Sequence, residues 1–174
     1  LEISGSALKL KDSVSADYET RNSYVVIITA TDTGGLSTSQ TFTVSVTNVN
    51  DAPTDLALSA NSIVENATGA TVGTLSATEV DTGDSVTYSV SGADAASFEI
   101  SGSTLKLKDS VSADYEVQTS YSVTVTATDT GGLTTSASYS VSVTNANESP
   151  SVTNSTTASI AENTTGVLTV TSTD

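Results

Sequence analysis

Acidic side chains recur in this sequence at the points where stretches of alternating apolar residues end, and carboxylates at such places can bind cations. The pairs in Asp17-Tyr18-Glu19 and Asp114-Tyr115-Glu116 are spaced i, i+2, as is the pair in Glu79-Val80-Asp81. In an extended segment, side chains two residues apart lie on the same face. Calcium takes about six to eight oxygen ligands in a flexible arrangement, so several such segments must converge to bind it.

Further oxygen-bearing groups stand near these pairs along the chain. Asp129 follows an alternating stretch and precedes a Gly-Gly pair, while Glu65 lies near the start of a repeat. Asn48-Val49-Asn50-Asp51 and Asn145-Ala146-Asn147-Glu148 come just before the two prolines. A single acidic pair is ordinarily an exposed loop feature, so a binding site depends on whether the fold brings these segments together.

The composition excludes several classes of function. The chain has 20 Asp and Glu against 5 Lys and Arg, a net charge of −15, which disfavours nucleic acid and anionic membrane as partners. It has no His and no Cys, so the commonest general base, thiolate metal sites and disulfides are missing. No apolar run approaches the roughly 20 residues that a bilayer crossing needs. We therefore expect a cation-binding protein that is not an enzyme and does not insert into a membrane.

The chain is built from an internal repeat. Leu1 to Pro53 aligns without gaps on Phe98 to Pro150, an offset of 97 residues, and both copies contain the words LKLKDSVSADYE, TATDTGGL and VSVTN. We predict the second half of one repeat over 1–51, a complete repeat over 52–149 and the start of a third over 150–174. Both ends then fall inside a repeat, as expected for a piece of a longer polypeptide or for an assembly in which neighbouring molecules supply missing strands.

Apolar residues alternate with Ser and Thr in the pattern of half-buried β-strands. Tyr121–Thr128 and Ala137–Thr144 show it most clearly, and it recurs around 24–30 and 42–46. Weaker strands are predicted at 55–59, 71–78, 85–90, 98–100 and 105–107, which makes seven in a repeat. Seven short strands separated by Gly-containing turns predict an all-β, immunoglobulin-like Greek-key sandwich in tandem. A β-solenoid is the main alternative, but its period would be much shorter.

Two sets of side chains have structural interpretations. Lys9, Lys11, Lys106 and Lys108 alternate with Leu, and we interpret them as solvent-facing charges on an edge strand that discourage aggregation. Tyr88, Tyr121 and Tyr139 occupy inward positions of the alternation, so we expect core packing rather than a sugar-binding platform.

Along its whole length the sequence resembles the cadherin and bacterial cadherin-like repeats, including those of repeats-in-toxin adhesins. The family has a Glu-Asn after the first strand, an Asp-x-Glu before a late strand and an Asp-x-Asp in mid-repeat. It also has an Ala-x-Asp before Gly and a linker close to Asp-x-Asn-Asp-Asn. The corresponding segments here are Glu65-Asn66, Asp114-Tyr115-Glu116, Glu79-Val80-Asp81, Ala127-Thr128-Asp129 and Asn145-Ala146-Asn147-Glu148.

In that family calcium lies between consecutive domains, and the resemblance implies two such junctions here. The implied ligands of the first junction are Asp17, Glu19, Asn48, Asn50, Asp51, Glu79, Asp81 and Asp129. Those of the second junction are Glu65, Asp114, Glu116, Asn145, Asn147, Glu148 and Asp174.

The sequence departs from the family pattern inside these ligand sets. Asn48 and Asn145 replace the first linker Asp, Glu148 replaces a later one, and Glu79 replaces the first mid-repeat Asp. Fewer charges and longer side chains imply fewer calcium ions per junction, or weaker binding. We expect the first junction to be better formed, because its whole downstream repeat is present.

These features lead to an expected function. We predict calcium-stiffened spacer repeats of an extracellular bacterial surface adhesin, with calcium and neighbouring repeats as partners. The alternatives are a module that binds polysaccharide or associates with its own copies, and a subunit of an extracellular filament.

Overall fold

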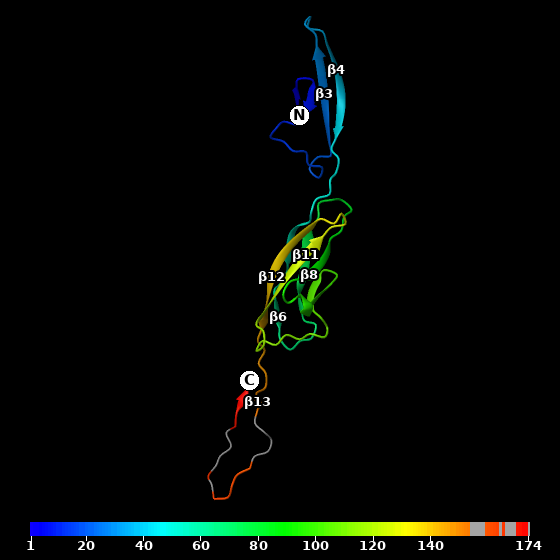
Figure 1. The fold of residues 1–174 in the computed structure, drawn as a ribbon. Helices are drawn as coiled ribbons and strands as arrows, with labels where there is room; N and C mark the ends of the chain where they lie inside the picture. The colour runs from blue at the N-terminus through cyan, green and yellow to red at the C-terminus, as the bar shows by residue number, and fades with distance from the viewer. Residues whose placement is uncertain (154–158, 164, 166–169, 174) are drawn as a thin grey trace.

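The computed structural model describes residues 1–153, 159–163, 165 and 170–173. The chain is elongated: the upstream half-repeat lies at one end, the complete repeat in the middle and a short C-terminal strand pair at the other end (Figure 1). Within the described ranges, no helix has the length and apolarity of a membrane span.

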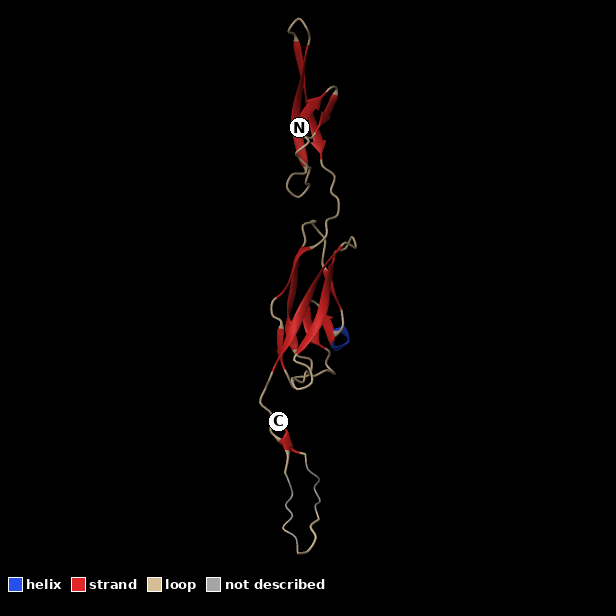
Figure 2. Cartoon of the chain, turned by 60° about the vertical axis from the view of Figure 1, so that its left-hand side comes forward, coloured by secondary structure: helices blue, strands red, loops and turns tan. Residues whose placement is uncertain are grey.

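The complete repeat is a sandwich of two four-stranded sheets (Figure 2). The first sheet has the order β5 (Thr54–Leu58), β7 (Thr71–Thr78), β10 (Thr104–Leu107) and β9 (Phe98–Ser101). The second has the order β6 (Ser62–Val64), β12 (Thr134–Thr144), β11 (Ser120–Thr128) and β8 (Thr87–Ser91). The predicted all-β sandwich is confirmed.

The alternation of apolar and hydroxyl side chains builds the core between these sheets. Tyr121, Val123, Val125 and Ala127 of β11 are buried, and the residues between them face outward. The ring of Phe98 meets that of Tyr121 edge to face, with centroids 5.4 Å apart. Tyr88 and Tyr139 pack against the same core, as the sequence predicts. These three tyrosines thus pack in or against the core, as predicted.

One strand was not predicted from the sequence. The chain leaves the first sheet after β5, and β6 pairs in parallel with β12 in the second sheet. A three-residue strand is too short to show a period of two, so the prediction of seven strands omitted it. The 3₁₀ turn η1 (Ala95–Ser97) was also not predicted.

The interpretation of the lysines as edge-strand charges is wrong for the complete repeat. Strand β10 lies between β7 and β9, so Lys106 is not at an edge. Its ammonium group pairs with Glu99 at 3.0 Å and with Asp109 at 2.6 Å. Lys9 makes the same two pairs in the upstream copy, with Glu2 and Asp12.

The upstream part repeats the second half of the sandwich. It contains β1 (Glu2–Ser4), β2 (Ala7–Lys9), β3 (Ser23–Thr31) and β4 (Ser37–Ser45), which pair as β1 with β2 and β3 with β4. In β3 the outward positions include Val25 and Ile27, 63% and 68% exposed, where β11 has Ser122 and Thr124. The two copies thus share strand pairing but differ on their outer faces.

The C-terminal part has one pair of short strands, β13 (Ser151–Val152) and β14 (Ser172–Thr173). This pairing is antiparallel, like that of β5 with β7 in the complete repeat. The boundaries of the three predicted domains stay a prediction.

Truncation of a core side chain tests the sandwich. Leu105→Ala is expected to lower the free energy of unfolding of the complete repeat by about 2–4 kcal/mol, because Leu105 is fully buried and its loss leaves a cavity. Native-state hydrogen exchange of the β11 amides measures the change. Leu8→Ala, at the equivalent half-buried upstream position, is the control and should leave those amides unchanged. Equal effects of the two variants would contradict this packing.

Candidate metal sites at the two repeat junctions

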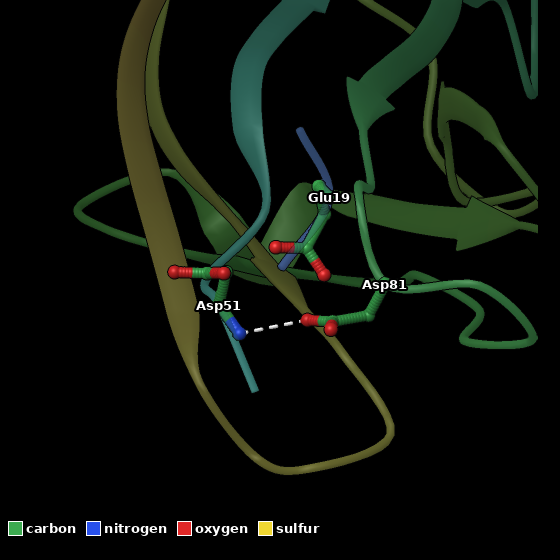
Figure 3. A group of neighbouring side chains, drawn as sticks. All are labelled: Glu19, Asp51 and Asp81. Carbon is green, nitrogen blue, oxygen red and sulfur yellow. Dashed lines mark hydrogen bonds between the residues drawn. The ribbon is translucent and has the colours of Figure 1, made fainter. Parts of the chain in front are cut away.

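Three carboxylates from three separate segments meet at the first junction. Glu19 comes from the turn before β3, Asp51 from the linker and Asp81 from the loop after β7. One oxygen of each lies within 4.8 Å of the others. Figure 3 shows the three side chains facing a common space. The group therefore joins the upstream repeat, the linker and the complete repeat.

Hydrogen bonds hold the linker against Asp81, which is 8% exposed. The side-chain amide of Asn48 donates to Asp81 Oδ1 at 2.8 Å. The backbone N–H of Asp51 donates to Asp81 Oδ2 at 2.7 Å, the bond drawn in Figure 3. Both oxygens of this carboxylate thus accept a bond from the linker.

A second group of carboxylates lies beside the first. Oxygens of Glu79, Asp84 and Asp129 lie within 4.8 Å of one another. The backbone N–H of Asp81 donates to Glu79 Oε1 at 3.0 Å, whereas Glu79 Oε2 is buried without a hydrogen-bond partner. A buried carboxylate oxygen without a partner is costly, so a positive ligand at this oxygen would be favourable.

Asp84 is not among the residues predicted from the sequence. A turn through Gly83, with φ of +94°, reverses the chain, and the backbone N–H of Asp84 donates to the carbonyl of Asp81 at 3.1 Å. This brings Asp84 back toward Glu79, and the hydroxyl of Thr130 donates to its carboxylate. The signal that could have found it is an acidic residue three positions after Asp81 across a Gly turn.

Asp129 is the most firmly bonded member of this second group. Its burial raises the pKa, but hydrogen bonds outweigh burial and leave the pKa below its ordinary value. Asn50 donates its side-chain amide to Asp129 Oδ2 at 2.8 Å, and the backbone N–H of Leu133 donates to Oδ1 at 2.8 Å. Asp129 is therefore a stable anion at neutral pH.

The structure does not bring Asp17 into either group. Its carboxylate accepts the backbone N–H of Thr20 at 3.0 Å and the Thr20 hydroxyl at 2.8 Å, which lower its pKa. It lines a cleft of about 340 Å³ together with Glu19, Asn48 and Asp51. Asp17 thus borders the junction while its oxygens serve the local turn.

At the second junction the three carboxylates come from the complete repeat itself. Oxygens of Glu65, Asp114 and Glu116 lie within 4.8 Å of one another. Glu65 is 3% exposed and accepts the backbone N–H groups of Ala146 at 2.7 Å and Tyr115 at 2.6 Å. These two bonds hold the pKa of Glu65 below its ordinary value.

The pKa of the neighbouring Glu116 is shifted in the opposite direction, above its ordinary value. Desolvation raises its pKa, and the negative charges of Glu65, Glu148 and Asp114 add to the rise. The side-chain amide of Asn145 donates to Glu116 Oε1 at 3.0 Å. The repulsion within this group makes it a place where a cation would be favourable.

The other predicted ligands of the second junction are not members of this carboxylate group. Asn66 donates its side-chain amide to Glu148 Oε1, and Asn147 is exposed, with an amide 3.4 Å from the Glu148 carbonyl. Asp174 lies outside the described residues. Among the residues that the structure describes, carboxylates from both sides of a linker meet only at the first junction.

These groups fit a hard cation such as calcium. Asp81, Asp129 and Glu65 are buried, yet in the described part of the chain Lys and Arg form salt bridges only with Glu2, Asp12, Glu99 and Asp109. The available donors are all oxygens, and one oxygen of Glu79 has no partner. Such a set suits calcium and not the nitrogen and sulfur preferences of zinc.

Comparison with known proteins supports the resemblance to cadherins. Residues 60–144 match the cadherin domain. The extracellular domain of protocadherin gamma B4 is similar at 28% identity, with a TM-score of 0.59 over 79% of this chain and 24% of that one. The EC1-2 segment of human protocadherin-24 is similar at 25% identity, with a TM-score of 0.62 over 76% of this chain and 70% of that one.

A longer match extends the likeness to most of the chain. Extracellular cadherin domains 3–6 of protocadherin gamma B2 share the fold at 23% identity, with a TM-score of 0.64 over 91% of this chain and 40% of that one. The chain thus spans about a quarter of the gamma B4 chain and about two fifths of the gamma B2 chain. The complete repeat is thus a domain of cadherin-like fold.

The buried Glu65 should make the stability of the cadherin-like domain depend on pH. Its pKa is lower folded than unfolded, so its contribution is present above the unfolded value of about 4.3 and is lost as pH falls through the folded value. Between about pH 5 and 3, the melting temperature of Glu65→Gln should fall less steeply with decreasing pH than that of the unmodified chain. Glu162→Gln, at the exposed equivalent position, is the control. Identical profiles for Glu65→Gln and the unmodified chain would contradict this assignment.

Proposed function

We propose that these repeats are a calcium-stiffened spacer in the extracellular part of a bacterial surface adhesin. The observation that carries the proposal is the meeting of Glu19, Asp51 and Asp81 from both sides of a linker. A rod of such repeats would hold adhesive domains away from the cell surface.

The residues of the two groups at the first junction would hold the ion. Glu19, Asp51 and Asp81 form one group, and Glu79, Asp84 and Asp129 form the other, with the Asn50 side chain beside Asp129. Calcium, when bound, would supply the positive charge that lets these carboxylates lie together. Without it, the carboxylates repel one another across a short linker, and the upstream repeat is free to move away.

The second junction would act in the same way with fewer groups. Glu65, Asp114 and Glu116 form its described part, and we propose Asn145, Asn147, Glu148 and Asp174 as its remaining members. With Asn at the first linker position in both copies, each junction carries less negative charge than the family pattern. Affinities of about 10⁻⁴ to 10⁻³ M, typical of extracellular modules, suit this composition.

The extracellular location is supported by the similar structures, which are extracellular domains of protocadherins. The bacterial surface is supported by the near-identical copies and by strands in which Ser and Thr take most outward positions. Polysaccharide binding gains no support from Tyr88, Tyr121 and Tyr139, because these side chains pack in or against the core.

A calcium titration tests the proposal. In small-angle scattering, calcium should increase the maximum dimension of the chain and narrow the distribution of its interatomic distances. Calcium should also raise the melting temperature. Asp81→Asn should weaken calcium binding by about tenfold or more, because it removes a charge from the shared group. Asp55→Asn makes the same charge change at an exposed position outside the groups, where a φ of 52° suits Asn.

Two results would overturn the proposal. One is a maximum dimension and melting temperature that calcium leaves unchanged. The other is equal weakening by Asp81→Asn and Asp55→Asn, which would show that only net charge matters.

A further inference from the structure

The first linker is bonded to the cadherin-like domain by donors that need no metal ion. Asn48 and the backbone N–H of Asp51 donate to the two oxygens of Asp81, at 2.8 and 2.7 Å. Asn50 donates to Asp129 Oδ2 at 2.8 Å. Asp81 and Asp129 are both less than 10% exposed, so water competes little for these bonds.

The chemistry of the donors decides what happens without a cation. An Asp at position 48 would place a second negative charge beside Asp81, and only a bound cation could relieve their repulsion. The Asn48 amide is neutral and donates a hydrogen bond instead, and hydrogen bonds to charged acceptors are among the stronger ones. Asn in place of the family's Asp at position 48 thus replaces a contact that requires an ion by a hydrogen bond that forms directly.

The turn at Gly131 also leaves space for the Asn50 side chain of the linker. A Cβ atom added to Gly131 would run into Asn50 Oδ1 and lie 2.6 Å from its Cγ, so the Asn50 side chain would have to shift from its place beside Asp129. Gly131 has no positive φ, unlike Gly132 at +90°, so its missing side chain matters for the space that Asn50 occupies rather than for backbone conformation. The equivalent Gly34 would meet only the side chain of its own turn, at 3.3 Å.

We propose that Asn48, Asn50 and Gly131 keep this linker attached to the cadherin-like domain in the absence of calcium. Removal of the ion then frees only the upstream repeat, and the hinge lies before Asn48 rather than along the whole linker. This inference goes beyond the proposed function, because it concerns the state with no ion bound.

The second linker makes its hydrogen bonds to a different repeat. There Asn145 donates to Glu116, and the backbone N–H of Ala146 donates to Glu65. Both acceptors belong to the repeat that precedes the linker. The first linker position thus bonds to the repeat that follows it at the first linker, through Asn48, and to the repeat that precedes it at the second, through Asn145.

Amide hydrogen exchange of the full chain, measured by NMR with excess chelator or with calcium, tests the proposal. In chelator the Asp51 amide should exchange at least about tenfold more slowly than an unstructured amide, because it is bonded to Asp81. Asn48→Asp should lose this protection in chelator and regain it in calcium. Asn145→Asp is the matched control and should leave Asp51 protected in both.

A second pair of variants tests the fit of the turn. Gly131→Ala should speed exchange of the Asp51 amide in chelator by several-fold, whereas Gly34→Ala should not. Protection of the β11 amides confirms in each variant that the domain is folded.

Exchange of Asp51 at the unstructured rate in the unmodified chain with chelator would overturn the proposal, and so would unchanged protection in Asn48→Asp. A chain that binds no calcium would contradict the proposed function, yet it would still show Asp51 protected. The two failures are therefore distinguishable.

Discussion

The structure depends on how it accommodates carboxylates that are buried close together without basic partners. Asp81, Asp129 and Glu65 lie at the two ends of the cadherin-like domain, where burial makes uncompensated charge costly. The chain meets that cost first with hydrogen bonds from backbone N–H groups and from Asn side chains. What hydrogen bonds leave uncompensated, as at Glu79 Oε2, is what a cation would neutralise.

The fold places these groups at the domain ends because each follows a strand. Glu79 and Asp81 follow β7, Asp129 follows β11, and the linkers follow β4 and β12. An antiparallel sandwich brings the ends of its strands to two poles, so residues distant in sequence gather there. Repeats joined in series then have these oxygen-bearing side chains where the joints are, and the Val, Leu and Tyr core between the sheets keeps the poles apart.

Much of the fold follows from the sequence. Alternation over nine residues in β11 predicts a half-buried strand, and the 97-residue offset predicts that β1 to β4 repeat β9 to β12. The prediction failed where local pattern is short or ambiguous. Strand β6 has three residues, and Lys106 looked like an edge residue because a strand's position within its sheet depends on partners elsewhere in the chain.

The sequence by itself determined which oxygen-bearing residues the chain offers, because their types and spacing are properties of the chain and match a known ligand pattern. Only the tertiary structure decided which of them meet. It turned Asp17 toward Thr20, brought Asp84 to Glu79 through a Gly turn, and paired Asn48 with Asp81 over 33 positions of the chain. The physical reason is that each of these outcomes depends on side-chain direction and long-range packing, which spacing along the chain does not encode.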